Sequence, residues 1–289
     1  MKSRLVQFGS LLMLTVSMVS CNTGITFPPV SEEATGNHNM GQFVWHDLAT
    51  SDPSIARQFY TEVFGWQYET LGSGDNAYYV IKNDGKAIGG IFKLASKFGS
   101  GSEWIGSMSV NDVDAAIDYN TRNGGTTIFD KSTFKGRGET AMVQDPQGAI
   151  VAFLYAEGGD PVITQARDVT FNSWLWDELW TTDLEGSLDY YKGLAGYDTE
   201  EVEFSEVPYY LFKADNKNLS GAIGNPVEGA RSAWMPYVKV KDVNETVAKA
   251  KAAGAHIMME PNPKIRKGTV AVILDPTGGQ ITIQQWITR

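Results

Sequence analysis

The sequence is poor in the residue types that build disulfides, metal sites and nucleic-acid interfaces. Its single cysteine, Cys21, excludes a disulfide within the chain. Of the three histidines, neither His38 nor His256 has a partner at ligand spacing. Lysine and arginine number 24 against 34 aspartate and glutamate, the formal net charge is −10 at pH 7, and no basic cluster occurs. Because phosphate binding needs clustered cations, we expect no nucleic-acid partner.

Long apolar runs are also missing, apart from one stretch at the amino end. Residues 5–19 follow a short basic segment, are too few for a permanent membrane span, and have the form of a secretory signal peptide. The run ends in MVSC at residues 18–21, which resembles a bacterial lipoprotein box. The resemblance implies a signal peptide over residues 1–21, lipidation of Cys21 and a membrane partner. With Asn22 next, it also implies an envelope location, in the outer membrane facing the periplasm. A cysteine that merely lies near an ordinary cleavage site is the alternative.

An internal repeat divides most of the chain into two domains. The segment FVWHDLATSDPSIARQFYTEVFGW at residues 43–66 matches SWLWDELWTTDLEGSLDYYKGLAGY at residues 173–197. Equivalent residues are offset by 131 here, as in Trp45 and Trp176, and by 130 further on, as in Trp104 and Trp234. We therefore predict five parts: signal peptide 1–21, flexible tether 22–40, first domain 41–157, linker 158–171 and second domain 172–289.

Each domain is itself built twice. In the first, a strand over residues 42–49 leads to a helix that begins near Asp52 and ends at Gly65, and short strands follow. The same order then repeats, with a helix over residues 113–123 and two strands joined by the turn Asp145-Pro146-Gln147-Gly148. Helices that alternate with groups of short strands predict an α+β fold with mixed strand pairing.

The combined pattern resembles the vicinal oxygen chelate superfamily, which includes glyoxalases, bleomycin-resistance proteins and extradiol dioxygenases. The pattern is strand, D-x-x-x-A-x-x-F-Y, F-G-W, V-x-D-V and D-P-x-G, and it covers residues 42–157 and 172–287. The resemblance implies two tandem glyoxalase-type domains, each a pair of βαβββ units whose mixed sheets curl into a cup that holds the ligand. It leaves the reaction open, because this fold carries many chemistries.

Metal-dependent members of this superfamily place a ligand on the first and last strand of each unit. The resemblance puts these positions at residues that supply no good donor for a divalent metal. They are Trp45, Gly89 or Gly90, Ile105 and Ala152 in the first domain, and Trp176, Ser220 or Gly221, Met235 and Thr282 in the second. We therefore expect no metal and no other cofactor. No G-x-S-x-G motif or readable Ser/His/Asp arrangement points to nucleophilic catalysis either.

The family register turns alternate residues of the first strands into the cups. In the first domain these are Phe43, Trp45, Asp47 and Ala49, opposite the apolar Ile150, Ala152 and Leu154. In the second domain they are Trp174, Trp176, Glu178 and Trp180, opposite Gln280, Thr282, Gln284 and Trp286. Aromatic walls with a few polar groups suit small organic ligands, and we predict that the second cup is the better site. Tryptophans that simply fill a lost site are the alternative.

Asp47 and Glu178 are the candidate catalytic residues, because a carboxylate that faces a cup needs a partner or water and can act as a general base. The sequence favours a glyoxalase-like envelope lipoprotein that binds a small organic molecule without the family metal site. A metal-dependent lyase or dioxygenase of the same superfamily, and a non-catalytic interaction module of the envelope, stay open as alternatives.

Overall fold

The computed structural model describes residues 25–95, 101–202 and 208–286. Cys21 and the predicted signal peptide lie outside these ranges. The described chain forms two domains of the same topology, each with one eight-stranded mixed sheet, and the predicted α+β fold is confirmed. No helix among the described residues is long and apolar enough to cross a membrane.

The first domain is a sheet in the order β2-β3-β4-β1-β5-β8-β7-β6 with two helices on one face. Strands β1 and β5 are antiparallel neighbours at the centre, and each is parallel to the last strand of its own unit. The elements are β1 (Phe43–Thr50), α1 (Pro53–Phe64), β2 (Gln67–Leu71), β3 (Tyr78–Asn83), β4 (Lys86–Lys93), β5 (Ser102–Ser109), α2 (Val113–Arg122), β6 (Thr126–Phe134), β7 (Gly138–Gln144) and β8 (Ile150–Ala156).

The second domain repeats this order as β10-β11-β12-β9-β13-β16-β15-β14. Its elements are β9 (Trp174–Thr181), α3 (Leu184–Ala195), β10 (Asp198–Val202), β11 (Tyr209–Ala214), β12 (Lys217–Gly224), β13 (Ala233–Val240), α4 (Val243–Ala252), β14 (His256–Met259), β15 (Val270–Leu274) and β16 (Gln280–Gln285). Each sheet has one face toward the cup and one toward the helices, so successive side chains of a strand alternate between the cup and the core.

The helices begin where the repeat places aspartate. The Asp52 carboxylate accepts hydrogen bonds from the backbone amides of Ser54 and Ile55, which the first turn of α1 leaves without helical partners. Asp112, Asp183 and Asp242 cap α2, α3 and α4 in the same way. Thus the repeated aspartates fix where the four helices begin.

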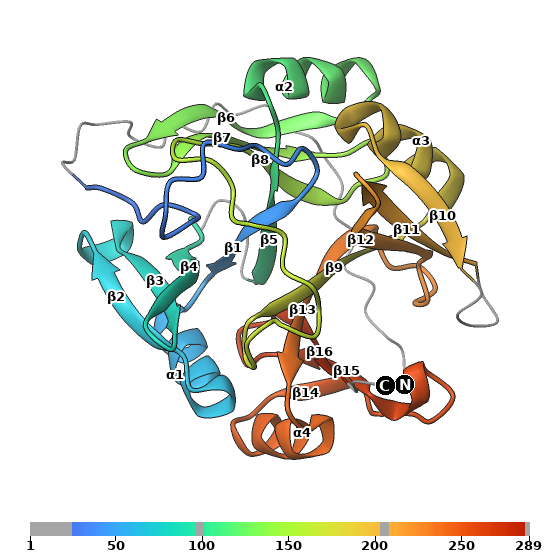
Figure 1. Ribbon diagram of the computed structural model, residues 1–289. Helices are drawn as coiled ribbons and strands as arrows, with labels where there is room; N and C mark the ends of the chain where they lie inside the picture. Colours follow the sequence, from blue (N-terminus) through green and yellow to red (C-terminus); the bar gives the residue numbers. More distant parts are fainter. Residues whose placement is uncertain (1–24, 96–100, 203–207, 287–289) are drawn as a thin grey trace.

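The two domains pack through their helix-covered faces. Helix α1 lies beside α4, and α2 beside α3 (Figure 1), so each apolar core contains residues of both domains. The hydroxyl of Tyr60 donates to Asp275 at 2.7 Å and accepts from the Trp104 indole at 2.8 Å. Tyr191, Asp145 and Trp234 repeat this arrangement from the other side. The repeated Tyr, Asp and Trp residues therefore join the domains.

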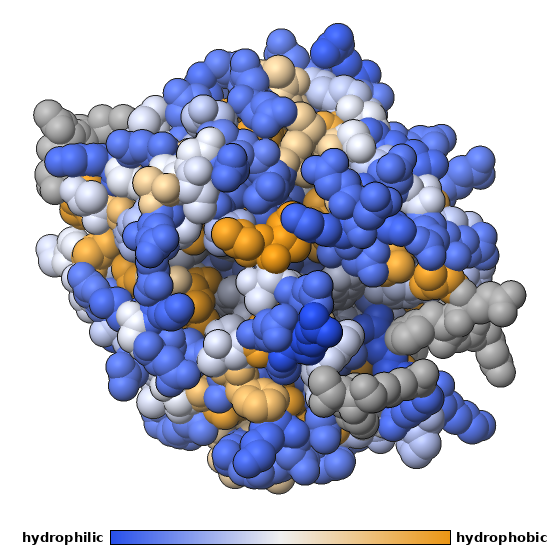
Figure 2. Space-filling model, in the orientation of Figure 1, coloured by the Kyte–Doolittle hydropathy of each residue, from blue (hydrophilic) through white to orange (hydrophobic). Residues whose placement is uncertain are grey.

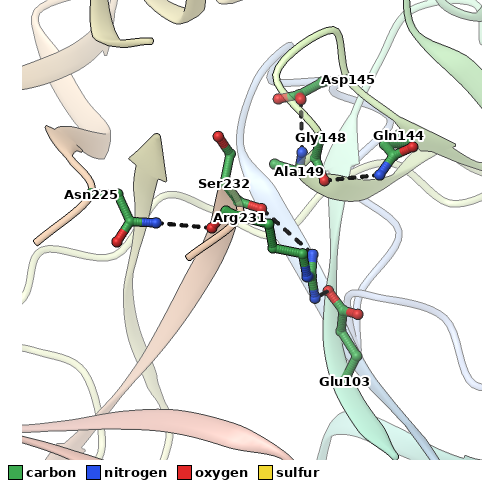
Figure 3. Close-up of polar contacts among 8 residues, drawn as sticks. All are labelled: Glu103, Gln144, Asp145, Gly148, Ala149, Asn225, Arg231 and Ser232. Carbon is green, nitrogen blue, oxygen red and sulfur yellow. Dashed lines mark hydrogen bonds and ion pairs between the residues drawn. The ribbon is translucent and has the colours of Figure 1, made fainter. Parts of the chain in front are cut away.

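The polar rim and the centre of this interface differ in burial. At one exposed edge, Arg231 of the second domain pairs with Glu103 of the first (Figure 3). At the centre, His46 Nε2 lies 2.8 Å from Asp177 Oδ1, and both residues are buried. His46 and Asp177 occupy equivalent positions in β1 and β9, so the pair lies close to the axis that relates the two domains.

The segment before β1 differs from the predicted tether, because residues 25–40 pack against the first domain. The backbone amide of Phe27 donates to the carbonyl of Lys135, and the amide of Gly36 donates to that of Gly158. Val30 is buried in the apolar cluster around Trp45. Isolated apolar side chains anchor this segment to the domain surface. Their spacing has no helical or strand period, so the sequence pattern did not reveal this role.

Candidate functional site

The centre of the first cup is a hydrogen-bonded group of three side chains. Alternation along β1 turns Trp45 and Asp47 to the same face, as the sequence predicts. The Trp45 indole donates to Asp47 Oδ1 at 3.1 Å and to the Tyr78 hydroxyl oxygen at 3.0 Å, while that hydroxyl donates to Asp47 Oδ1 at 2.6 Å. Tyr78 comes from β3, so two strands fix the orientation of the carboxylate.

Asp47 is the one group of the three that keeps a free polar atom. Burial raises the pKa of its carboxyl, and the charge of Arg137 and the donors Tyr78 and Trp45 oppose that shift. Its Oδ2 accepts no hydrogen bond from any residue that the structure describes, and the side chain remains partly exposed. Asp47 therefore offers one acceptor oxygen to whatever enters the cup.

One end of the first cup is closed by Arg137 and by the segment Phe27–Val30, which we call the strap. The Arg137 guanidinium lies 3.8 Å from the centre of the Trp45 ring, and its Nε donates to the carbonyl of Pro28 at 2.7 Å. The Phe27 ring packs edge-on against Tyr78 and Phe134, with ring centres about 5 Å apart. The strap therefore connects the two walls of the cup.

The other end of the first cup is lined by small and apolar side chains. Ala49, Ile105 and Ala152 form a buried apolar cluster there. Four further apolar side chains on this side are only partly buried: Phe92, Leu94, Met142 and Ile150. This end combines an apolar wall with the free oxygen of a single carboxylate, which is the composition expected of a site for a small organic molecule.

The second cup repeats the polar group with different chemistry. Trp176, Glu178 and Tyr209 stand at the equivalents of Trp45, Asp47 and Tyr78, and the Trp176 indole donates to the Tyr209 hydroxyl at 3.1 Å. Glu178 accepts from the Tyr237 hydroxyl at 2.7 Å and from the Trp180 indole at 2.9 Å. It also forms an ion pair with Arg266.

These contacts close the second cup around its carboxylate. Trp180, at the equivalent of Ala49, packs beside the carboxylate and donates to it, and Glu178 is only 3% exposed. Met235 and Val272 complete an apolar cluster around it. The predicted cup residues Trp176, Glu178, Trp180, Thr282 and Gln284 thus lie together, but their bulk fills the cup.

Two of the predicted residues of the second cup lie elsewhere, and a third lies at its edge. Trp174 packs in the core between the domains against Trp66 and Trp104, and its indole donates to the carbonyl of Ile88 at 2.6 Å. Trp286 lies beyond β16 and is 40% exposed. Gln280 begins β16 and is partly exposed.

A change of register explains the position of Trp174. The pairing of β9 with β13 shifts between Trp176 and Trp174, so strict alternation fails there. The same irregularity occurs in β1 between Phe43 and Trp45, and Phe43 contacts Trp234 of the second domain instead of the first cup. The prediction that Trp174 and Phe43 face the cups is therefore wrong.

The residues at the family's ligand positions do not fit a divalent metal. An added Cβ at Gly90 would lie 2.0 Å from the Tyr78 hydroxyl oxygen and 2.5 Å from Asp47 Oδ1, so tyrosine occupies the space of a ligand side chain. Gly221 is crowded by Tyr209 in the same way, at 2.1 Å. Within the described ranges, no group of three or more His, Cys, Asp or Glu side chains is arranged to hold a metal ion.

The residues of the cups that sequence reasoning missed include two tyrosines and two arginines at corresponding places in the two domains. Tyr78 and Tyr209 carry the offset of 131 that relates the domains, so an extended comparison of the repeats would have found them. Arg137 and Arg266 come from the turns before β7 and β15 and are offset by 129, so they do not align. No sequence motif predicts that a side chain from a turn will reach into a cup.

Two hollows outside the cups carry little chemistry. One of about 600 Å³ lies between the end of α1 and residues 170–172, and Asp84 is the one ionisable residue among the described residues that line it. The other, of about 540 Å³, lies beside residues 224–230 and has Glu228 alone. Most of the face shown in Figure 2 is hydrophilic, with apolar side chains in small separate patches. The cups therefore remain the candidate sites.

Comparison with known proteins supports the architecture. A family model described as the glyoxalase/bleomycin resistance protein/dioxygenase superfamily matches residues 173–283, most of the second domain, and the first domain is its repeat. The second domain therefore matches this superfamily, and the first domain repeats its topology. The provisionally named glyoxylase CFP32 of Mycobacterium tuberculosis is 28% identical over 263 residues, which cover 89% of this chain and 97% of that protein. The anthracycline biosynthesis protein DnrV of Streptomyces peucetius is 25% identical over 260 residues, 84% of this chain and 92% of that protein.

Solved structures of this superfamily share the fold at low identity. An extradiol ring-cleaving dioxygenase from B. fuscum superposes with a TM-score of 0.59 at 15% identity, over 91% of this chain and 75% of that one. A Mn(II)-bound glyoxalase from Novosphingobium aromaticivorans gives 0.57 at 12% identity, over 86% and 84%. These likenesses concern the fold alone.

Proposed function

We propose that this glyoxalase-like protein binds a small organic molecule in its first cup, without the family metal, and that Asp47 accepts a hydrogen bond from it. The observation that carries the proposal is the contrast between two equivalent carboxylates. Asp47 has a free oxygen beside the small side chains of Ala49 and Ala152. Glu178 is closed in by Trp180 and paired with Arg266.

Any chemistry in this cup would be acid–base catalysis by Asp47. A carboxyl whose pKa is raised by burial exchanges protons closer to neutral pH than an exposed one does. The similarity to Streptomyces proteins named for anthracycline biosynthesis supports an aromatic ligand. The metal-dependent alternative is disfavoured by the donor set, because tyrosine hydroxyls crowd Gly90 and Gly221.

The filled second cup favours the other alternative, a non-catalytic module, for the second domain alone. Trp180, Met235 and Tyr237 pack there as core residues do, at 8%, 3% and 2% exposure. We assign the second domain a supporting role, because its helices and strands complete the core of the first.

Binding by Asp47 can be tested with a matched pair of variants. Isothermal titration of the mature protein with phenol and with 2-, 3- and 4-hydroxybenzoate should show binding of at least one compound. Asp47→Asn should weaken it about tenfold or more, the value of a hydrogen bond to a charged group. Glu178→Gln should leave it unchanged.

Three results would contradict the proposal. They are an absence of binding by all compounds, a loss caused by Glu178→Gln instead of Asp47→Asn, and a stoichiometric metal whose removal by EDTA lowers the melting temperature.

We further propose that the mature protein is anchored to the envelope by lipid on Cys21. The apolar run over residues 5–19 and the sequence MVSC that follows it support this proposal. Cys21→Ser should move the protein from the detergent phase to the aqueous phase in Triton X-114 partitioning. Unchanged partitioning, or a mature amino terminus elsewhere, would contradict the anchor.

A further inference from the structure

The strap places an aromatic ring and a carbonyl oxygen inside the first cup. The Phe27 ring lies against Tyr78, and the carbonyl oxygen of Pro28 accepts from Arg137 Nε at 2.7 Å. The strap is held closely, because an added Cβ at Gly136 would lie 2.4 Å from the Phe27 carbonyl oxygen. The chain itself thus supplies the cup with the groups of an aryl carbonyl compound.

Arg137 is not satisfied by this arrangement. The residue is 6% exposed, yet its Nη2 is buried and has no hydrogen-bond partner in the described part of the chain. A buried Nη2 without an acceptor is costly, and a bidentate oxygen ligand such as a carboxylate would satisfy it. An acceptor that used both Nε and Nη2 would have to take the place of the Pro28 carbonyl.

Comparison with the second cup shows why Arg137 forms no ion pair with the carboxylate of its own cup. Its counterpart Arg266 forms an ion pair with Glu178 and donates to Gln284. Asp47 is one methylene shorter than Glu178, and no ion pair within 4.0 Å joins it to Arg137 among the described residues. The first cup therefore keeps a cation that the second one neutralises.

We propose that the first cup recognises an aromatic compound carrying a carboxylate or carbonyl oxygen, that Arg137 binds this oxygen, and that the strap holds its place in the free protein. This inference rests on the proposed function and adds the class of ligand. Asp47 Oδ2 would accept a hydroxyl of the same compound at the open end. Binding of the oxygen at Arg137 requires Phe27 and Pro28 to leave the cup.

Three probes separate the contributions of the two polar residues. By titration calorimetry, 4-hydroxybenzoate should bind at least about tenfold more tightly than phenol, which lacks the anionic group, and 4-hydroxybenzamide should fall between them. Arg137→Gln should abolish this preference and leave the affinity for phenol within about twofold. Arg137→Lys should retain part of it, because the charge remains while the planar fork is lost.

The strap makes an opposite prediction. Phe27→Ala should tighten 4-hydroxybenzoate about threefold or more, because a weaker internal occupant leaves a larger fraction of the protein competent to bind. Glu33→Ala, an exposed change just beyond the strap, is the matched control and should have no effect. Amide hydrogen exchange over residues 26–31 should accelerate when 4-hydroxybenzoate saturates the protein.

The outcomes distinguish this inference from the proposed function. If a probe binds through Asp47 but Arg137→Gln leaves the carboxylate preference intact, the inference is wrong and the proposed function stands. If Phe27→Ala weakens binding, or the strap stays protected from exchange, the strap is a wall of the site and not an occupant. If the wild type does not distinguish 4-hydroxybenzoate from phenol, Arg137 does not read the oxygen, whether or not its variants fold. Binding of no probe by the wild type or by Phe27→Ala would contradict both.

Discussion

At the residue scale, the two cups differ in the size of the side chain that lies beside the carboxylate. The sequence assigns four tryptophans to the second cup and one tryptophan with mainly apolar residues to the first, and aromatic walls suggested the better site in the second. In the structure the Trp180 indole donates to Glu178, which is buried, whereas its equivalent is Ala49 in the first cup, where Asp47 is partly exposed. Alternation gives the face of a side chain, but only packing gives the volume that remains.

Local register sets a second limit on prediction at this scale. Trp45, Asp47, Trp176 and Glu178 were placed correctly because β1 and β9 are regular there. Trp174 was not, because a bulge has no signal in the alternation of apolar residues. Arg137 and Arg266 lie in turns outside any period, so their contribution to the cups required the structure.

The crowding of Gly90 and Gly221 leads to a prediction about stability. Gly90→Ala and Gly221→Ala each put a Cβ about 2 Å from a buried tyrosine hydroxyl, and should cost about 1–3 kcal/mol of unfolding free energy through overpacking. Gly224→Ala is the matched control in the same strand as Gly221, because its Cβ would meet nothing within 4 Å. Urea denaturation measures all three, and equal stabilities would show that the hydroxyls yield freely.

The raised pKa of Asp47 leads to a prediction about pH. Since burial makes the folded protein hold this proton more tightly than the unfolded chain does, stability is fully present below the unfolded pKa, about 3.9, and is lost as pH rises through the folded pKa. Asp47→Asn does not titrate, so its stability relative to the wild type should be more favourable at pH 7 than at pH 4. A relative stability that falls with pH would show that hydrogen bonds and Arg137 outweigh burial.

At the scale of elements, the repeat predicts more than single residues do. The predicted strand over residues 42–49 and the two predicted helices match β1, α1 and α2 within one or two residues, whereas β2 and β6 were not predicted. The sequence does not reveal which elements of different domains meet. Tyr60 and Asp275 are 215 residues apart, and neither of the sequence motifs that contain them predicts their hydrogen bond.

That contact leads to a prediction for both halves of the interface. Tyr60→Phe removes the hydroxyl between Asp275 and Trp104 and leaves two buried groups unpaired, which should cost about 1–3 kcal/mol of unfolding free energy. Tyr191→Phe should cost a similar amount, because Asp145 and Trp234 lose the same bonds. Tyr155→Phe, on a side chain that is 37% exposed, is the control and should change little. Unequal effects of the first two changes in urea denaturation would show that the halves are not energetically equivalent.

At the scale of the whole molecule, the two domains form one cooperative structure. The cluster around Trp66 contains residues of α1 and of α4, and the cluster around Trp234 contains residues of α2 and of α3. Separation of the domains would expose both clusters to water. The face of each domain that is buried against the other is thus the helix side, opposite the cup.

The pair His46 and Asp177 tests this cooperativity. His46→Ala leaves a carboxylate buried at the centre of the interface without its partner at 2.8 Å, and should lower the unfolding free energy by about 3–5 kcal/mol. Arg231→Ala, which breaks the exposed pair with Glu103 at the edge of the same interface, should cost less than about 1 kcal/mol. Because both domains share their cores, His46→Ala should shift one transition to lower urea, with tryptophan fluorescence and far-ultraviolet circular dichroism changing together. Two separate transitions would show instead that each domain holds its own structure once the central pair is lost.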